Sequence, residues 1–239
     1  MDSQQNKTNK YIMTTKKKQV PTTDEPLALD VQLSKTEEYI EKNWKKITVA
    51  LLAIIAVVVG FYIYRNIMNQ KELEAQKAIV SAQTAFAQQQ YDQALNGDGT
   101  SKGFLKVISE YSGTETANLA KLYAGLAYAK TDKVDEAIKY LEDYSAQDDD
   151  IVSPNAVAAL GNLYIQKGNN EKGVQTLLKA ADMANNDAIS PVCLRQAAEI
   201  YESMNQNDKA VELYNRIKKD YFRNPIARDI DKYIERATK

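Results

Sequence analysis

Apolar residues are distributed unevenly along the chain, and one stretch stands apart from the rest. The eighteen residues 47–64, ITVALLAIIAVVVGFYIY, contain no charged side chain. A helix of that length rises about 27 Å, close to the roughly 30 Å hydrocarbon thickness of a bilayer. Trp44 before the run, and Tyr62 and Tyr64 near its end, place aromatic rings near the two membrane interfaces. The pattern therefore predicts a transmembrane helix at residues 47–64.

Two other interpretations of this run are a cleaved secretion signal and a buried core helix. A cleaved signal has a short charged start and a small-x-small cleavage site. Here 46 residues precede the run, and the sequence at its end, GFYIYRN (60–66), has no such cleavage site. A buried core helix normally keeps one polar stripe, which this run lacks. An uncleaved anchor is therefore favoured over both.

Charges on either side of the run predict its orientation. Lys42, Lys45 and Lys46 lie directly before it, with the lysines of 16–18 further back. The far flank has Arg65, then Lys71 and Lys77, so the excess of positive charge lies before the run. Flanks rich in Lys and Arg remain in the cytoplasm. We therefore expect a cytoplasmic N-terminus, with the rest of the chain on the opposite side of the membrane.

The segment before the run divides into two parts. Residues 1–33 are rich in Lys, Thr, Gln and Asn and have no apolar periodicity, which is typical of a disordered cytoplasmic tail that serves as solvated slack. Residues 34–46 begin with Ser34 and Glu37 in capping-box spacing and place apolar side chains near one face. They predict a short juxtamembrane helix, for which an interfacial position is favoured over a cytoplasmic docking site.

After the run, residues 65–239 show helical periodicity and a repeating unit. Residue pairs suited to helix N-termini recur at spacings of 37, 37 and 34, at Thr116-Ala117, Ser153-Pro154, Ser190-Pro191 and Asn224-Pro225. In each unit a first helix carries a small residue and a tyrosine, and a second helix carries another small residue and then a large one. These positions hold Gly125, Tyr128, Ala137 and Leu141, then Gly161, Tyr164, Gly173 and Leu177, then Ala198, Tyr201, Ala210 and Tyr214.

Small residues at these positions allow the two helices of a hairpin to approach closely, and the large residue fills the gap to the next hairpin. We therefore predict an all-α fold, a transmembrane helix followed by an α-solenoid. The pattern resembles the tetratricopeptide repeat, whose small, Tyr and Ala signature positions it matches without the Trp. An incomplete unit interrupted by NGDGTSKG precedes these three, and the charged segment from Pro225 suits a C-terminal cap.

Composition narrows the chemistry. The net charge is −1, histidine is absent, and Cys193 is the single cysteine. These facts exclude histidine-based catalysis, most zinc sites and an intramolecular disulfide, and they leave no basic surface suited to nucleic acid. In the register of a calcium-binding loop, NGDGTSKGF has Ser101 where the sixth position needs Gly and is followed by Val107 where the twelfth needs Glu, so a turn is favoured there. A solvated loop is favoured for the acidic residues 148–150, and a buried packing role is favoured for Cys193. We expect no catalytic residue, cofactor, metal or small-molecule substrate.

Binding would then fall to the concave face, which the first helix of each unit lines in such solenoids. Counting from the helix starts gives candidate protein-binding residues at Leu119, Leu122, Leu126, Asn155, Ala158, Asn162, Arg195 and Glu199. The asparagine amides suit the backbone of a bound strand, although plain solvation explains them more simply. Leu122 and Leu126 either contact a partner in the groove or pack against the helix that continues from the span.

The order of these features resembles the bacterial single-span tetratricopeptide family that includes the ancillary subunit of the Sec translocon. The matching segments are EEYIEKNWKKI, GDGTSKGF, EYSGTETANLAKLYAGLAY and the terminal DIDKYI, while the long polar tail and the unconventional first unit depart from the pattern. The resemblance implies the inner membrane, a periplasmic repeat domain, and association with Sec translocon subunits, a periplasmic chaperone and secreted polypeptides. The alternative function is a structural scaffold for another cell-envelope assembly; no residue constellation supports an enzyme.

Overall fold

The computed structural model describes the backbone of residues 28–239 and the side chains from residue 36 onward. Most of the tail predicted for residues 1–33 therefore lies outside the described residues. Within 28–239 all regular elements are α-helices, accompanied by one isolated bridge between Gly97 and Lys102. The predicted all-α class is confirmed. The chain divides into two units, residues 1–60 and residues 61–239.

Helix α1 (Ala28–Ala87) is 60 residues long and contributes to both units. It begins inside the predicted tail and continues without a break past residues 46 and 64, where the sequence suggested boundaries. No proline lies within it, and Gly60 is its single glycine, so nothing in the sequence interrupts its hydrogen bonding. The predicted juxtamembrane helix, span and first repeat helix are parts of this one element.

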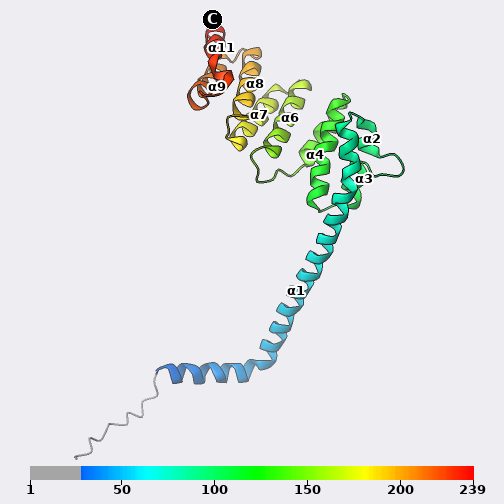
Figure 1. The fold of residues 1–239 in the computed structure, drawn as a ribbon. Helices are drawn as coiled ribbons and strands as arrows, with labels where there is room; N and C mark the ends of the chain where they lie inside the picture. Colours follow the sequence, from blue (N-terminus) through cyan, green and yellow to red (C-terminus); the bar gives the residue numbers. More distant parts are fainter. Residues whose placement is uncertain (1–27) are drawn as a thin grey trace, which may run out of the picture. The chain divides into compact units, whose positions relative to one another are not determined.

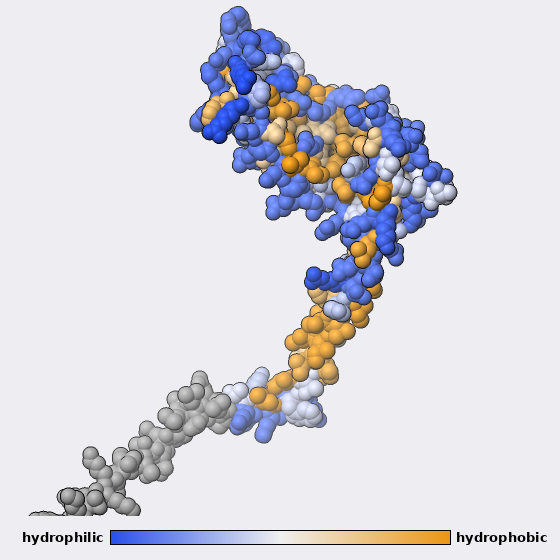
Figure 2. All heavy atoms as spheres, in the orientation of Figure 1, coloured by the Kyte–Doolittle hydropathy of each residue, from blue (hydrophilic) through white to orange (hydrophobic). Residues whose placement is uncertain are grey.

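The apolar part of α1 is exposed to its surroundings. Among the described residues, α1 is the one helix with the length and composition needed to cross a membrane, and none of its most apolar window is buried. Figure 2 shows this stretch as a continuous apolar surface along the rod of α1. Leu51, Val57 and Phe61 are each more than half exposed. A helix that is apolar on every exposed side is typical of a membrane span rather than of a water-facing helix.

Residues 61–239 form a stack of helices (Figure 1). The end of α1 packs with α2 (Tyr91–Asn96), α3 (Phe104–Glu110) and α4 (Glu115–Lys130) around a core that contains Phe104, Ala75 and Ile79. The expected interruption of the first unit is confirmed, because residues 97–103 separate α2 from α3. Asp98 holds this turn by accepting hydrogen bonds of 2.7–3.0 Å from the backbone N–H and hydroxyl groups of Thr100 and Ser101.

Three helical hairpins follow, and each pairs a first helix with a second helix. We call α4, α6 and α8 the A helices and their partners α5, α7 and α9 the B helices. Their bounds are α5 Val134–Asp143, α6 Val152–Gln166, α7 Asn170–Ala184, α8 Ser190–Ser203 and α9 Asn207–Asp220. The short helices α10 (Pro225–Arg228) and α11 (Ile230–Ala237) end the stack, and α11 packs on α9 with Ile230 fully buried.

The hairpins are as close as the small residues predicted. A Cβ atom at Gly125 would lie 2.7 Å from Leu141 Cγ, and one at Gly161 would lie 3.0 Å from Leu177 Cγ. A Cβ atom at Gly173 would lie 2.9 Å from the Gly161 carbonyl oxygen. Real Cβ atoms need more space than this, so the α4–α5 and α6–α7 hairpins depend on the missing side chain.

Three of the four predicted N-caps are wrong. Helix α4 is capped by Thr114, which accepts a 3.0 Å hydrogen bond from the Ala117 N–H. Asp149 accepts bonds from the first amides of α6, and Asn186 accepts bonds from the amides that lead into α8. The predicted cap residues Thr116, Ser153 and Ser190 lie within the first helical turn instead, and all three are buried. Asn224, which accepts from the Ile226 N–H, caps α10 as predicted.

Candidate functional site

A groove between two neighbouring A helices contains three of the predicted binding residues. We call it the A groove; its volume is about 270 Å³, and it is lined by Asn155, Ala158, Ala159, Asn162, Ala188, Ile189, Val192, Cys193 and Gln196. The first four residues come from α6, and most of the others from α8. Helical spacing explains why Asn155, Ala158 and Asn162 share one wall, since they stand at i, i+3 and i+7.

The A groove has an apolar floor and polar edges. Ala158 and Cys193 are buried, and burial raises the pKa of the Cys193 thiol to about 11, so the sulfur remains a neutral packing atom. The Asn155 side chain donates a 2.8 Å hydrogen bond to the Ile151 carbonyl, which leaves its amide oxygen as an acceptor. Asn162 is exposed and makes no side-chain hydrogen bond within residues 36–239. This arrangement suits a short apolar segment whose backbone meets the amides.

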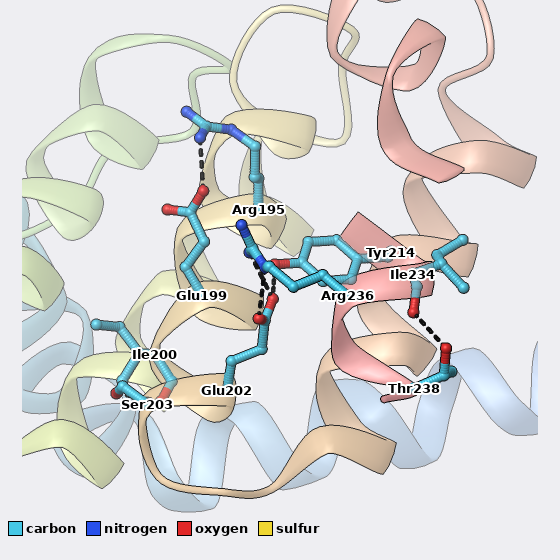
Figure 3. Close-up of polar contacts among 9 residues, drawn as sticks. All are labelled: Arg195, Glu199, Ile200, Glu202, Ser203, Tyr214, Ile234, Arg236 and Thr238. Carbon is cyan, nitrogen blue, oxygen red and sulfur yellow. Dashed lines mark hydrogen bonds and ion pairs between the residues drawn. The ribbon is translucent and has the colours of Figure 1, made fainter. Parts of the chain in front are cut away.

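Arg195 and Glu199 lie on α8 but do not line the A groove. They form an ion pair of 2.7 Å with each other, and both are partly exposed (Figure 3). Beside them, the Glu202 carboxylate accepts hydrogen bonds from Arg236 of α11 and from the Tyr214 hydroxyl. The two predicted residues share one face of α8 with Glu202, at i, i+4 and i+7, and their role in partner binding stays a prediction.

The three predicted leucines fill the joint between α4 and α6. Leu122 is 6% exposed and belongs to a core cluster with Leu141, Ala156 and Leu163, while Leu119 and Leu126 pack against the same cluster. Leu122 is therefore not exposed in the concavity, and it does not belong to the core cluster that the end of α1 joins. Partner binding by Leu119 and Leu126, which are partly buried, stays a prediction. The Leu122 side chain is buried in the contact between successive repeats.

Comparing equivalent positions in successive repeats explains why the α4–α6 joint is filled and the A groove is open. Leu119, Leu122 and Leu126 stand 36 residues before Asn155, Ala158 and Asn162. Large side chains therefore close the α4–α6 joint, whereas smaller or polar ones leave the A groove open at the α6–α8 joint. The sequence prediction missed the α8 wall, Val192 and Gln196 above all, because it counted equivalent positions on every A helix. A groove between two helices is lined by a different side of each helix. The sequence signal for the α8 wall was therefore the set of α8 positions that face α6, such as Val192 and Gln196.

Comparison with known proteins agrees with this architecture. Residues 37–219 match the model of the tetratricopeptide repeat-like domain family. The chain belongs to this family. No curated protein matches it. Two similar solved structures are of a Podosopora anserina putative kinesin light chain with nearly identical TPR-like repeats; each is 15% identical and covers 68% of this chain, with TM-scores of 0.53 and 0.54 over 85% and 86% of the other chain.

These similarities establish the fold of the repeat array. Tetratricopeptide repeats are scaffolds that present surfaces to protein partners, and they are typically non-catalytic. No group of three or more metal-ligating side chains occurs within the part of the chain that the structure describes. The repeat family therefore implies a protein–protein interaction module.

Proposed function

We propose that the chain is a membrane-anchored periplasmic binding module, an ancillary factor at the Sec translocon that binds chaperone partners or emerging secreted polypeptides. The observation that carries this proposal is the A groove, where Asn155 and Asn162 flank an apolar floor on the A-helix face of a tetratricopeptide array. An unfolded client offers what this surface suits, namely backbone amides and small apolar side chains. The translocon assignment rests on the sequence resemblance.

Affinity purification of the full chain in mild detergent tests this function. Sec subunits together with varied secreted polypeptides would support it. One stoichiometric partner from another envelope assembly would instead favour the scaffold function. Asn162→Arg places a bulky cation in the groove and should deplete the groove-bound partners. Gln166→Arg adds the same side chain one turn later, on an exposed position outside the groove, and is the matched control.

The location is proposed as the bacterial inner membrane, with a single pass, a cytoplasmic N-terminus and a periplasmic repeat domain. It is supported by the lysine-rich flank before the apolar run. Protease added to spheroplasts should remove the part of the chain after Arg65. A repeat domain that stays protected until the membrane is dissolved would reverse the orientation.

A further inference from the structure

The first B helix is shorter than its two counterparts. Ala137 of α5 corresponds to Gly173 of α7 and to Ala210 of α9, at intervals of 36 and 37 residues. By this alignment, Asp143, the last residue of α5, corresponds to Lys179 and Arg216, and both α7 and α9 continue for about one further turn. Residues 144–151 follow α5 without helical structure. The α5–α7 joint therefore lacks a turn of helix on one side.

The same joint lacks an ion pair that closes the next one. At the α7–α9 joint, Arg216 of α9 bonds to Asp182 of α7 at 2.7 Å. The equivalent residues one unit earlier are Lys179 and Ala146. The cation is present, but the residue that aligns with its carboxylate partner is an alanine, which lies beyond the end of α5. Lys179 is exposed, and no ion pair involves it within residues 36–239.

Lys179 and Ala146 line one cavity, which we call the B trough. Its volume is about 460 Å³, and its lining is Leu141, Glu142, Tyr144, Ala146, Ala156, Val157, Leu160, Tyr164, Lys172, Thr176 and Lys179. Val157 and Leu160 are only partly buried, so apolar surface remains accessible on its floor. The B trough is bounded by the end of α5, by α6 and by α7, whereas the A groove lies between α6 and α8.

The other charges of the B trough satisfy one another. Lys172 lies 3.0 Å from a Glu142 carboxylate oxygen and 4.0 Å from the centre of the Tyr164 ring, and the Tyr164 hydroxyl donates to the same carboxylate. Glu142 is therefore neutralised by its neighbours. Lys179 is left as the cation without a counter-charge, beside an apolar floor.

We propose that the B trough is a second docking site, for a peptide segment of a partner protein that carries a carboxylate next to an apolar side chain. The apolar side chain lies on Val157 and Leu160, and the carboxylate pairs with Lys179 in the place that Asp182 occupies at the next joint. The proposal rests on the proposed role in protein binding, but it assigns a surface separate from the A groove, which shares no lining residue with the B trough.

Two matched peptides test the proposal with the full chain held in nanodiscs. One is a dye-labelled, acetylated Ser-Leu-Leu-Asp-Ser amide, and the other has Asn in place of Asp. Fluorescence anisotropy measures both affinities. The Asp peptide should bind about two- to fivefold more tightly, the range expected of one exposed ion pair. Lys179→Gln should abolish this preference, and Val157→Ser should weaken both peptides.

Two further variants give the assay its specificity. Ala146→Asp supplies the carboxylate found at the next joint and should also abolish the preference, because Lys179 then has an internal partner. Lys130→Gln removes another exposed cation, at the end of α4, and should preserve the preference. Equal binding of the two peptides, a preference that survives Lys179→Gln, or no binding of either peptide at millimolar concentration overturns the proposal. Asn162→Arg should leave the preference unchanged, so failure here is distinct from failure of the A groove.

Discussion

Single glycines set the distance between the two helices of the α6–α7 hairpin. Gly161 and Gly173 face each other, and a Cβ atom on either would come within about 3 Å of backbone or of a large side chain. Backbone atoms of a packed helix cannot turn aside as the end of a side chain can. The hairpin would therefore have to open to accept even a methyl group.

Gly173→Ala is expected to lower the unfolding free energy by about 1 to 2 kcal/mol. Overpacking against the Gly161 carbonyl costs about 1 to 3 kcal/mol, and the better helix propensity of alanine recovers up to about 1 kcal/mol. Urea denaturation followed by circular dichroism measures the change. Gln175→Ala, on an exposed position of the same helix, is the control and should shift stability by less than about 0.5 kcal/mol. A stabilised Gly173→Ala protein would show that the hairpin has room to spare.

Residue-level prediction succeeded for packing and failed for capping. The periodic small residues were sufficient to place Gly125, Gly161 and Ala210 at helix contacts, because close packing leaves a direct mark on sequence. Capping was misassigned because Ser153 and Ser190 look like ideal caps before proline. Both are buried, and their hydroxyls bond instead to Asp149 and to the Ala181 carbonyl. Which hydroxyl caps a helix depends on the path of the preceding loop, which local sequence does not show.

At the scale of elements, the loops between repeats are tied to one another. The Asn186 side chain donates a 2.9 Å hydrogen bond to the Asp150 carbonyl, and the Asn224 side chain donates to the Asp187 carbonyl. Each asparagine also accepts from an amide at the start of its own following helix. One amide group thus fixes the start of a helix and its position against the previous repeat. Asp149 serves only the first purpose, because a carboxylate has no donor.

Asp149→Ala should destabilise the repeat domain by about 1 to 2 kcal/mol, the usual loss for a helix N-cap. The carboxylate accepts bonds from the amides of Ile151, Val152 and Ser153, and from the Ser153 hydroxyl. Thermal unfolding of the purified protein reports the loss. Asp148→Ala removes a neighbouring exposed carboxylate that makes no such bonds and should have little effect. Equal effects of the two substitutions would refute the capping role.

The terminal helix is attached through a charged contact as well as through Ile230. Hydrogen bonds from Arg236, and secondarily from Tyr214, hold the pKa of the Glu202 carboxyl below the 4.5 usual for glutamate. A carboxyl whose pKa is lowered on folding adds stability above its unfolded pKa. That contribution is lost as the pH falls through the folded value. The C-terminal cap should therefore loosen in acid.

Glu202→Gln should remove this acid dependence. The unfolding free energy of the unmodified chain should exceed that of the variant by a constant amount near neutral pH. The difference should start to shrink as the pH falls below about 4.5, where the carboxyl of the unfolded chain takes up a proton, and it should be lost as the pH falls through the lower pKa of the folded protein. Denaturation at a series of pH values gives this difference directly. Glu212→Gln, an exposed position of α9 without an ion pair in the described structure, should show a flat difference. A flat profile for Glu202→Gln would contradict the assigned role.

At the scale of the whole molecule, the repeat domain begins inside α1. The Lys71 ammonium donates a 2.9 Å hydrogen bond to the Ser112 carbonyl, and Glu72 accepts bonds from the Thr116 amide and hydroxyl. Ala75 is fully buried in the first core cluster. The sequence predicted the array and its cap but placed a boundary after residue 64, because hydropathy alone marks where the apolar run stops. The sequence prediction also missed the B trough. The shorter α5, and the alanine at position 146 where the next repeat has the ion-paired Asp182, become visible only when the repeats are compared with one another.

Two soluble fragments test where the domain starts. A fragment of residues 66–239 retains the contacts of Lys71 and Glu72 and should fold as a helical domain whose circular dichroism is unchanged by a chelator. A fragment of residues 77–239 loses those hydrogen bonds and the burial of Ala75, which we expect to cost about 2 to 3 kcal/mol. For a domain of this size, that loss lowers the melting temperature by about 5 to 10 °C. Equal melting temperatures would mean that α1 before residue 77 is only a tether. A large difference would mean that the helix that carries the apolar run is also the first wall of the repeat array.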